Sequence, residues 1–149
     1  MNKDKFNLNW VLINELAVGP APRNIKHLDF LSSKGIKNVI SLCHHDELEE
    51  IPNTNEIFNY ESFPLPDHKK KVAPNIKDIN NVLDRIKDLK KNGPTYVHCF
   101  AGVERSPLIC IAWLMRESSL DLETSLEYLM KVNPSTCPLK YQLDVLKDL

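Results

Sequence analysis

Hydrophobic positions follow two different spacings along the chain, and each spacing predicts its own kind of element. Segments rich in β-branched and aromatic residues are typical of strands. They are a strand pair at a sheet edge, residues 10–18, and single strands at residues 36–42, 57–63 and 95–98. Apolar residues at every third or fourth position are typical of amphipathic helices. They occur in residues 24–34, 74–91, 106–116, 121–132 and 139–149.

The order of these elements predicts the fold class. Helices alternate with short strands, which favours an α/β architecture. We therefore expect a central, twisted and mostly parallel sheet of four to five strands, flanked by helices. Residues 106–116 are apolar nearly all round, so this helix should be central and buried. Asn24 and Asp121 are candidate N-caps, and Gly35 should end the first helix.

Length, charge and composition exclude several classes of function. The 149 residues predict one domain, residues 1–149, in which the polar residues 1–8 should be poorly ordered. The 19 Lys and Arg residues are balanced by 20 Asp and Glu residues, so no basic field would attract nucleic acid or an anionic membrane. We see neither a signal-peptide core nor an apolar run long enough to span a membrane. We expect a cytoplasmic monomer.

The four cysteines do not form a metal or disulfide framework. Cys43, Cys99, Cys110 and Cys137 are widely spaced and include no CxxC pair. Cys110 is most simply a core residue. The run from Cys43 to Asp46 holds several potential ligands, but adjacent side chains rarely converge on one ion, so we expect no metal. Its His44 or His45 could instead line a substrate mouth, or lie in an exposed loop before a short acidic helix, residues 46–50.

The segment TYVHCFAGVERSP, residues 95–107, carries the chemistry. It predicts a strand, a small loop containing Gly102, and a helix with Pro107 in its first turn. Unpaired backbone N–H groups converge between a strand and a helix N-terminus, and there they form an anion site. Gly102 supplies backbone freedom that a side chain would restrict.

Two residues make this anion site a reactive one. Cys99 opens the loop, where backbone N–H groups and a cation can stabilise its thiolate. Arg105 closes the loop, and its planar guanidinium can hold two oxygens of a phosphate at once. A thiolate facing a bound phosphate predicts covalent phosphoryl transfer. The alternative is a buried structural Cys99 beside an Arg105 that pairs with a carboxylate.

HCFAGVERS, residues 98–106, resembles the signature of cysteine-dependent protein phosphatases. The whole chain is most similar to the small atypical dual-specificity phosphatases, which consist of little more than a catalytic domain. Residues 9–12, 16–19, 31–36 and 39–42 match the opening pattern of that family, and residues 63–67, FPLPD, resemble its acid loop. The resemblance implies a fold like that of the protein-tyrosine phosphatases, a phosphoprotein substrate and no metal or other cofactor.

The resemblance also implies a role for each site residue. Cys99 would attack phosphorus, and the phosphate oxygens would bind Arg105 and the loop backbone at Phe100, Ala101, Gly102, Val103 and Glu104. Asp67 would protonate the leaving oxygen and then activate water. Ser106 would donate a hydrogen bond to the sulfur, and His98 would fix the loop from behind. For Asp67, the alternative is a turn residue or a carboxylate at a helix N-terminus.

Several alternatives remain open at this point. Glu104 is a carboxylate inside the phosphate loop; we expect it to point outward, and it should disfavour inositol-lipid substrates. The Lys69 to Lys71 run is either a solvated loop or a positive rim for an anionic substrate. Phosphotyrosine and phosphoserine or phosphothreonine are both candidate substrates. The competing functions are a non-hydrolysing phospho-motif binder, a phosphoinositide or RNA 5′-phosphatase, a sulfur transferase, and redox pairing of Cys99 with Cys43 or Cys110.

Overall fold

The computed structural model describes residues 5–149, which fold around a five-stranded sheet. The strands are β1 (Asn9–Leu12), β2 (Leu16–Gly19), β3 (Asn38–Ser41), β4 (Asn59–Ser62) and β5 (Thr95–His98). Their order across the sheet is β1-β2-β5-β3-β4, and only β1 runs antiparallel to its neighbour. The prediction of a mostly parallel sheet in an α/β fold is therefore confirmed.

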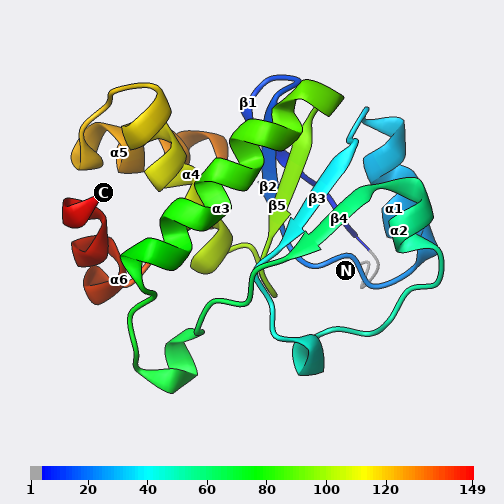
Figure 1. Ribbon diagram of the computed structural model, residues 1–149, viewed down its shortest axis with the longest axis horizontal. Helices are drawn as coiled ribbons and strands as arrows, with labels where there is room; N and C mark the ends of the chain where they lie inside the picture. Colours follow the sequence, from blue (N-terminus) through cyan, green and yellow to red (C-terminus); the bar gives the residue numbers. More distant parts are fainter. Residues whose placement is uncertain (1–4) are drawn as a thin grey trace.

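Helices cover both faces of this sheet (Figure 1). One face carries α1 (Ile25–Ser33) and α2 (Thr54–Ile57), and the other carries α3 (Ile76–Leu89), α4 (Arg105–Glu117), α5 (Leu122–Val132) and α6 (Lys140–Val145). The expected N-caps form, because the side chains of Asn24 and Asp121 accept backbone hydrogen bonds from His27 and Thr124.

The core has one layer on each side of the sheet. On the larger side, α4 packs between the sheet, α3 and α5, and its Leu108, Ile109 and Ile111 are fully buried, as predicted for a central helix. On the smaller side, Leu28 and Leu31 of α1 pack with residues of the sheet. Phe6 and Leu8 join this smaller layer, although residues 1–8 were expected to be poorly ordered. Residues 1–4 lie outside the described part of the chain.

The structure differs from the predicted secondary structure mainly at helices and turns of only a few residues. The short helix α2 begins at Thr54 and includes Ile57, which was predicted to open a strand. The acidic helix predicted for residues 46–50 is a single 3-10 turn, His45–Glu47. The terminal helix ends at Val145 and continues as a 3-10 turn, Leu146–Asp148. An element of one turn is too short to show a hydrophobic period, so pattern analysis cannot find it.

The sheet brings four loops to one edge. Gly19, His98, Ser41 and Ser62 are the last residues of β2, β5, β3 and β4, and they are register neighbours across the parallel strands. The loops that follow these strands therefore leave the same edge of the sheet. In open α/β sheets, ligands bind outside the carboxyl ends of the strands.

Candidate active site

A pocket of about 480 Å³ opens at this edge of the sheet. Its wall comes from three loops: residues 46–47 after β3, residues 67–69 after β4, and the phosphate loop, residues 99–105, between β5 and α4. The predicted nucleophile, cation and acid, Cys99, Arg105 and Asp67, all line this single pocket. Phe100, Ala101, Val103 and Glu104 line it as well, whereas Gly102 lies behind them and is buried.

Cys99 lies on the floor of the pocket, where only 2% of its surface is exposed. Its Sγ lies 3.2 Å from the hydroxyl oxygen of Ser106 in the first turn of α4. Behind the loop, His98 Nδ1 lies 3.1 Å from the carbonyl oxygen of Cys99 and donates to it. Burial lowers the pKa of His98 to about 4, so the ring is neutral at pH 7 and its proton on Nδ1 serves this hydrogen bond. These contacts are those that the predicted roles of Ser106 and His98 need.

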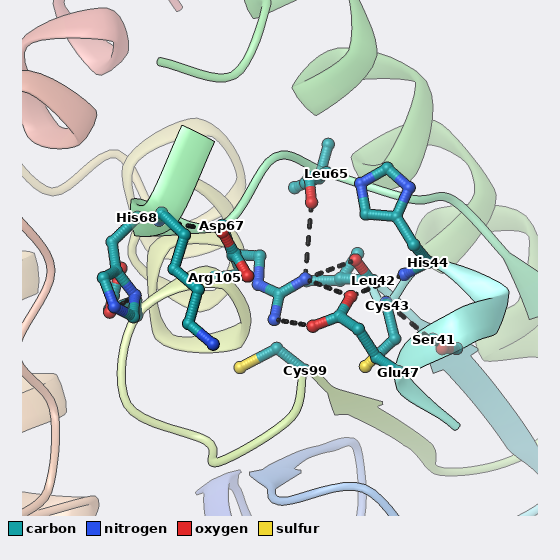
Figure 2. Close-up of polar contacts among 12 residues, drawn as sticks. Ser41, Leu42, Cys43, His44, Glu47, Leu65, Asp67, His68, Cys99 and Arg105 are labelled. Carbon is teal, nitrogen blue, oxygen red and sulfur yellow. Dashed lines mark hydrogen bonds and ion pairs between the residues drawn. The ribbon is translucent and has the colours of Figure 1, made fainter. Parts of the chain in front are cut away.

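Arg105 is held by a carboxylate that the sequence analysis did not single out. Glu47 accepts hydrogen bonds from Nη2 and Nη1 of Arg105 at 2.7 and 2.9 Å (Figure 2). Nη1 also donates to the carbonyl oxygens of Leu42 and Leu65, each at 3.3 Å. Within residues 5–149, Nε and the second Nη2 hydrogen have no protein acceptor, and these donors remain for a phosphate.

Electrostatics keep this pair charged. The hydrogen bond from Arg105 lowers the pKa of Glu47. Burial opposes the charge of Arg105, but the hydrogen bond to Glu47 and the nearby acidic groups raise its pKa above the ordinary value. The sequence left two roles open for Arg105, pairing with a carboxylate and binding a phosphate. This geometry is compatible with both at once.

Asp67 caps a turn and also lines the pocket, and its role as the acid stays a prediction. One of its oxygens, Oδ1, accepts a hydrogen bond from the backbone N–H of Lys69 at 2.8 Å and caps the 3-10 turn His68–Lys70. The residue nevertheless lines the pocket that contains Cys99 and Arg105. Leu65, two residues before Asp67, is fully buried, and its N–H donates to the carbonyl oxygen of Leu42. The acid loop is thus anchored at its start.

The phosphate loop rests on the turn that follows β2. Gly102 has a φ of +74°, and a Cβ at this position would lie 2.8 Å from the carbonyl carbon of Gly19. The N–H of Ala21 donates to the carbonyl of Phe100 at 3.1 Å. The turn that follows β2 therefore supports the loop that carries Cys99.

The C-terminal part of the chain supports the other side of the phosphate loop. Asn133, which is buried, donates to the carbonyl of Gly102 at 3.3 Å, and the N–H of Cys137 donates to Val103 at 2.8 Å. The carboxylate of Glu104 accepts a hydrogen bond from Gln142 and lies against His68, while the residue also lines the pocket, so its pointing outward stays a prediction. No sequence pattern marked Asn133 or Gln142, because their partners are far away along the chain.

The loop after β3 does not place its histidines as one of the two predictions had it. Neither His44 nor His45 lines the pocket, whose wall takes Asp46 and Glu47 from this loop instead. Cys43 is buried, whereas His45 and Asp46 are exposed, so these neighbours do not converge. Across residues 5–149, no three His, Cys, Asp or Glu side chains gather as potential metal ligands. In the same residues, no helix has the length and apolar character needed to cross a membrane.

Comparison with known proteins gives a consistent result. Residues 18–148 match the family model described as "Dual specificity phosphatase, catalytic domain". The chain is 42% identical to dual specificity protein phosphatase 14 of Mus musculus over 94 residues, which are 62% of this chain and 44% of that protein. It is 34% identical to dual specificity protein phosphatase 1 of Mus musculus over 103 residues, 68% of this chain and 25% of that protein.

The chain therefore spans less than half the length of these curated relatives. Among solved structures, Tk-PTP in its active form superposes with a TM-score of 0.84 at 23% identity, covering 95% of each chain. That likeness confirms the expected fold.

Proposed function

The chain belongs to the dual specificity phosphatase catalytic-domain family, and we propose that it hydrolyses phosphotyrosine and phosphoserine or phosphothreonine monoesters in proteins. The observation that carries this proposal is the convergence of Cys99, Arg105 and Asp67 on one pocket from two separate stretches of the chain, the phosphate loop and the loop after β4. A nucleophile, a cation for the phosphate and an acid for the leaving group are the three groups that this reaction needs.

In the proposed first step, the thiolate of Cys99 attacks phosphorus. A sulfur–phosphorus bond forms, the bond to the ester oxygen breaks, and Asp67 gives its proton to that oxygen. In the second step, water attacks the phosphocysteine while Asp67 takes a proton from it, the sulfur–phosphorus bond breaks, and inorganic phosphate leaves. Ser106 donates to the sulfur and stabilises it as a leaving group.

The phosphate itself is bound by the protein without a cofactor in this proposal. Arg105 offers its free Nε and Nη2 donors, and the backbone of the phosphate loop surrounds the same space. Donors that are fixed before the reaction stabilise charge that develops in the transition state. Glu47 fixes the orientation of Arg105, which reduces the reorganisation required when phosphate binds.

The walls of the pocket support a protein substrate over an inositol lipid. Besides Asp67, the wall contains the carboxylates of Asp46, Glu47 and Glu104, whereas its Lys and Arg residues are Lys69 and Arg105. A highly phosphorylated headgroup would meet repulsion there. Phe100, which is 57% exposed beside Cys99, instead offers an apolar surface to a peptide or an aromatic ring. A nucleophilic thiol also requires reducing conditions, so we propose a cytoplasmic location.

Two variants test this function. Cys99→Ser should abolish release of phosphate from phosphotyrosine and phosphothreonine peptides but should still bind them, which separates an enzyme from a binding module. Asp67→Asn should slow phenyl phosphate, a poor leaving group, by about 10²–10⁴-fold and a difluoromethylumbelliferyl ester far less. Turnover that persists in Cys99→Ser, or an equal effect of Asp67→Asn on both esters, would contradict the mechanism.

A further inference from the structure

A side-chain contact at hydrogen-bond distance joins the acid loop to the phosphate loop. His68 Nδ1 lies 2.8 Å from Glu104 Oε2. His68 directly follows Asp67, and Glu104 directly precedes Arg105, so the contact lies one residue away from two groups of the proposed mechanism. The phosphate loop makes this contact through the carboxylate of Glu104 and not through a backbone group.

Glu104 is held in place from the opposite side. Gln142 Nε2 donates to Glu104 Oε1 at 3.1 Å, and only 1% of Gln142 is exposed. The other end of this amide, Oε1, accepts the N–H of Leu139 at 2.7 Å, so its orientation is fixed. Each oxygen of the Glu104 carboxylate therefore has a defined partner, one from α6 and one from the acid loop. Because Gln142 holds the Glu104 carboxylate in place, that carboxylate can hold His68 of the acid loop in place in turn.

The acid loop itself has little other support near Asp67. After the buried Leu65, the residues 66–72 are at least partly exposed, and the turn His68–Lys70 is a single 3-10 turn. The bond from Lys69 to Asp67 Oδ1 lies within the turn and does not tie the turn to the rest of the protein. Within residues 5–149, the only side-chain hydrogen bond or ion pair that fastens this turn to the phosphate loop is that of His68 with Glu104.

We propose that Glu104 and His68 are positioning residues that hold Asp67 over the bound phosphate ester. The inference rests on the proposed function, because it presumes that Asp67 is the acid. A pair of this kind keeps the Glu104 carboxylate turned away from the phosphate and places the acid loop at the same time. Displacing a reacting group by about 1 Å can cost about 10²-fold in rate, so losing the pair should be seen in turnover.

The test uses the variants His68→Ala and Glu104→Gln and their combination, with Lys70→Ala as a control from the same turn. Lys70 is exposed and does not line the pocket. Each protein is assayed with phenyl phosphate and with the difluoromethylumbelliferyl ester, whose leaving group needs no proton. Inhibition by inorganic phosphate reports whether the phosphate loop itself is intact.

We expect His68→Ala and Glu104→Gln to lower kcat for phenyl phosphate by about tenfold or more, within the range that misplacement of a group produces. For the activated ester, His68→Ala should stay within about twofold of wild type, and its inhibition by phosphate should not change. The double variant should be no slower than the slower single variant, because both changes break one contact. Lys70→Ala should behave as wild type.

Three outcomes would overturn the inference: no effect of His68→Ala on phenyl phosphate, an equal effect on both esters, or a double variant whose loss is the product of the single losses. His68→Ala alters a half-exposed side chain, so this variant decides the matter even if Glu104→Gln does not fold. If Asp67→Asn is selective for the poor leaving group and His68→Ala is not, the positioning inference fails alone. If Asp67→Asn is not selective, the acid role in the proposed function fails with it.

Discussion

Glu47 contacts both terminal nitrogens of Arg105, with its two carboxylate oxygens 2.7 and 2.9 Å away. This bidentate geometry fixes the plane of the guanidinium as well as its position. The pair is largely buried, since 6% of the Arg105 side chain and 19% of the Glu47 side chain are exposed. Glu47 therefore determines which edge of Arg105 faces the pocket.

Replacing Glu47 should weaken phosphate binding more than it alters the fold. In Glu47→Ala, Arg105 would lose its orientation, and we expect kcat/KM to fall by about 10- to 100-fold, which corresponds to about 1.4–2.7 kcal/mol. The inhibition constant of inorganic phosphate should rise in parallel. Glu49→Ala, an exposed carboxylate in the same loop, is the control and should leave both values unchanged. Unaltered inhibition by phosphate in Glu47→Ala would refute this role.

The buried His98 should make stability depend on pH in a defined window. Its pKa falls from the ordinary 6.5 to about 4 on folding, so the unfolded chain binds a proton more readily than the folded protein between these values. The stabilisation is complete above pH 6.5 and is lost as the pH falls towards 4. The expected loss is about 3 kcal/mol in the free energy of unfolding.

Denaturant unfolding at a series of pH values measures this loss, with His98→Asn as the comparison. The variant should show a flatter profile between pH 6.5 and 4. It should still lose stability in more acidic solution, because the lowered pKa of Glu47 confines the loss of the Arg105 pair to pH values below about 4.5. An equally steep decline above pH 4.5 in the variant would rule out His98 as the source.

Gly102 should tolerate no side chain. Alanine at this position would combine a left-handed backbone with a Cβ only 2.8 Å from the backbone of Gly19, so the phosphate loop would have to move. We expect Gly102→Ala to lose about 10²-fold in kcat, as for a group misplaced by about 1 Å. Gly35→Ala is the matched control: its φ is +88°, but no atom lies within 4 Å of the added Cβ.

The control should therefore lose about 1 kcal/mol of stability from backbone strain and keep its activity. Thermal unfolding and steady-state kinetics on both variants separate the two effects. Equal activity of Gly102→Ala and Gly35→Ala would mean that the close approach to Gly19 does not matter.

Cys43 should be a slow partner for an oxidised Cys99. Burial and the charge of Glu47 raise the pKa of Cys43 to about 12, so at pH 7 only about one molecule in 10⁵ holds the reactive thiolate. Burial also raises the pKa of Cys110 far above the ordinary value. After peroxide oxidises Cys99 to the sulfenic acid, attack by Cys43 would form a disulfide and release water, at a rate that rises about tenfold for each pH unit.

Trapping with dimedone and peptide mass spectrometry follow the two products. At pH 7, the dimedone adduct of Cys99 should dominate, and the disulfide with Cys43 should gain as the pH is raised. Cys43→Ser should remove the disulfide, whereas Cys110→Ser should not. A rapid disulfide at pH 7 would show that Cys43 is far more acidic than its surroundings indicate.

A structural feature can be predicted from the sequence when the residues that form it lie close together along the chain. The apolar stripe of α3 and the buried α4 depend on residues a few positions apart, and both form where the pattern indicates. The phosphate loop is encoded in one contiguous segment, residues 95–107, so its residues could be named before the fold was known.

The residues that support the site lie far along the chain from the residues that they contact. Glu47 is 58 residues from Arg105, and Gln142 is 38 residues from Glu104. Neither residue has a local environment that distinguishes it from other polar residues, and each becomes specific only when the sheet and α6 bring it to the pocket. Local sequence patterns therefore single out Arg105 and Glu104 of the phosphate loop but miss Glu47 and Gln142, which contact their side chains.

The segment from Asn133 to Gln142 contacts three consecutive residues of the phosphate loop: Gly102, Val103 and Glu104. A fragment that ended after α5 would keep Cys99, Arg105, Asp67 and all five strands of residues 5–149, yet it would lose these three contacts. The part of this chain that supports the phosphate loop is thus longer than the stretch from Asp67 to Arg105.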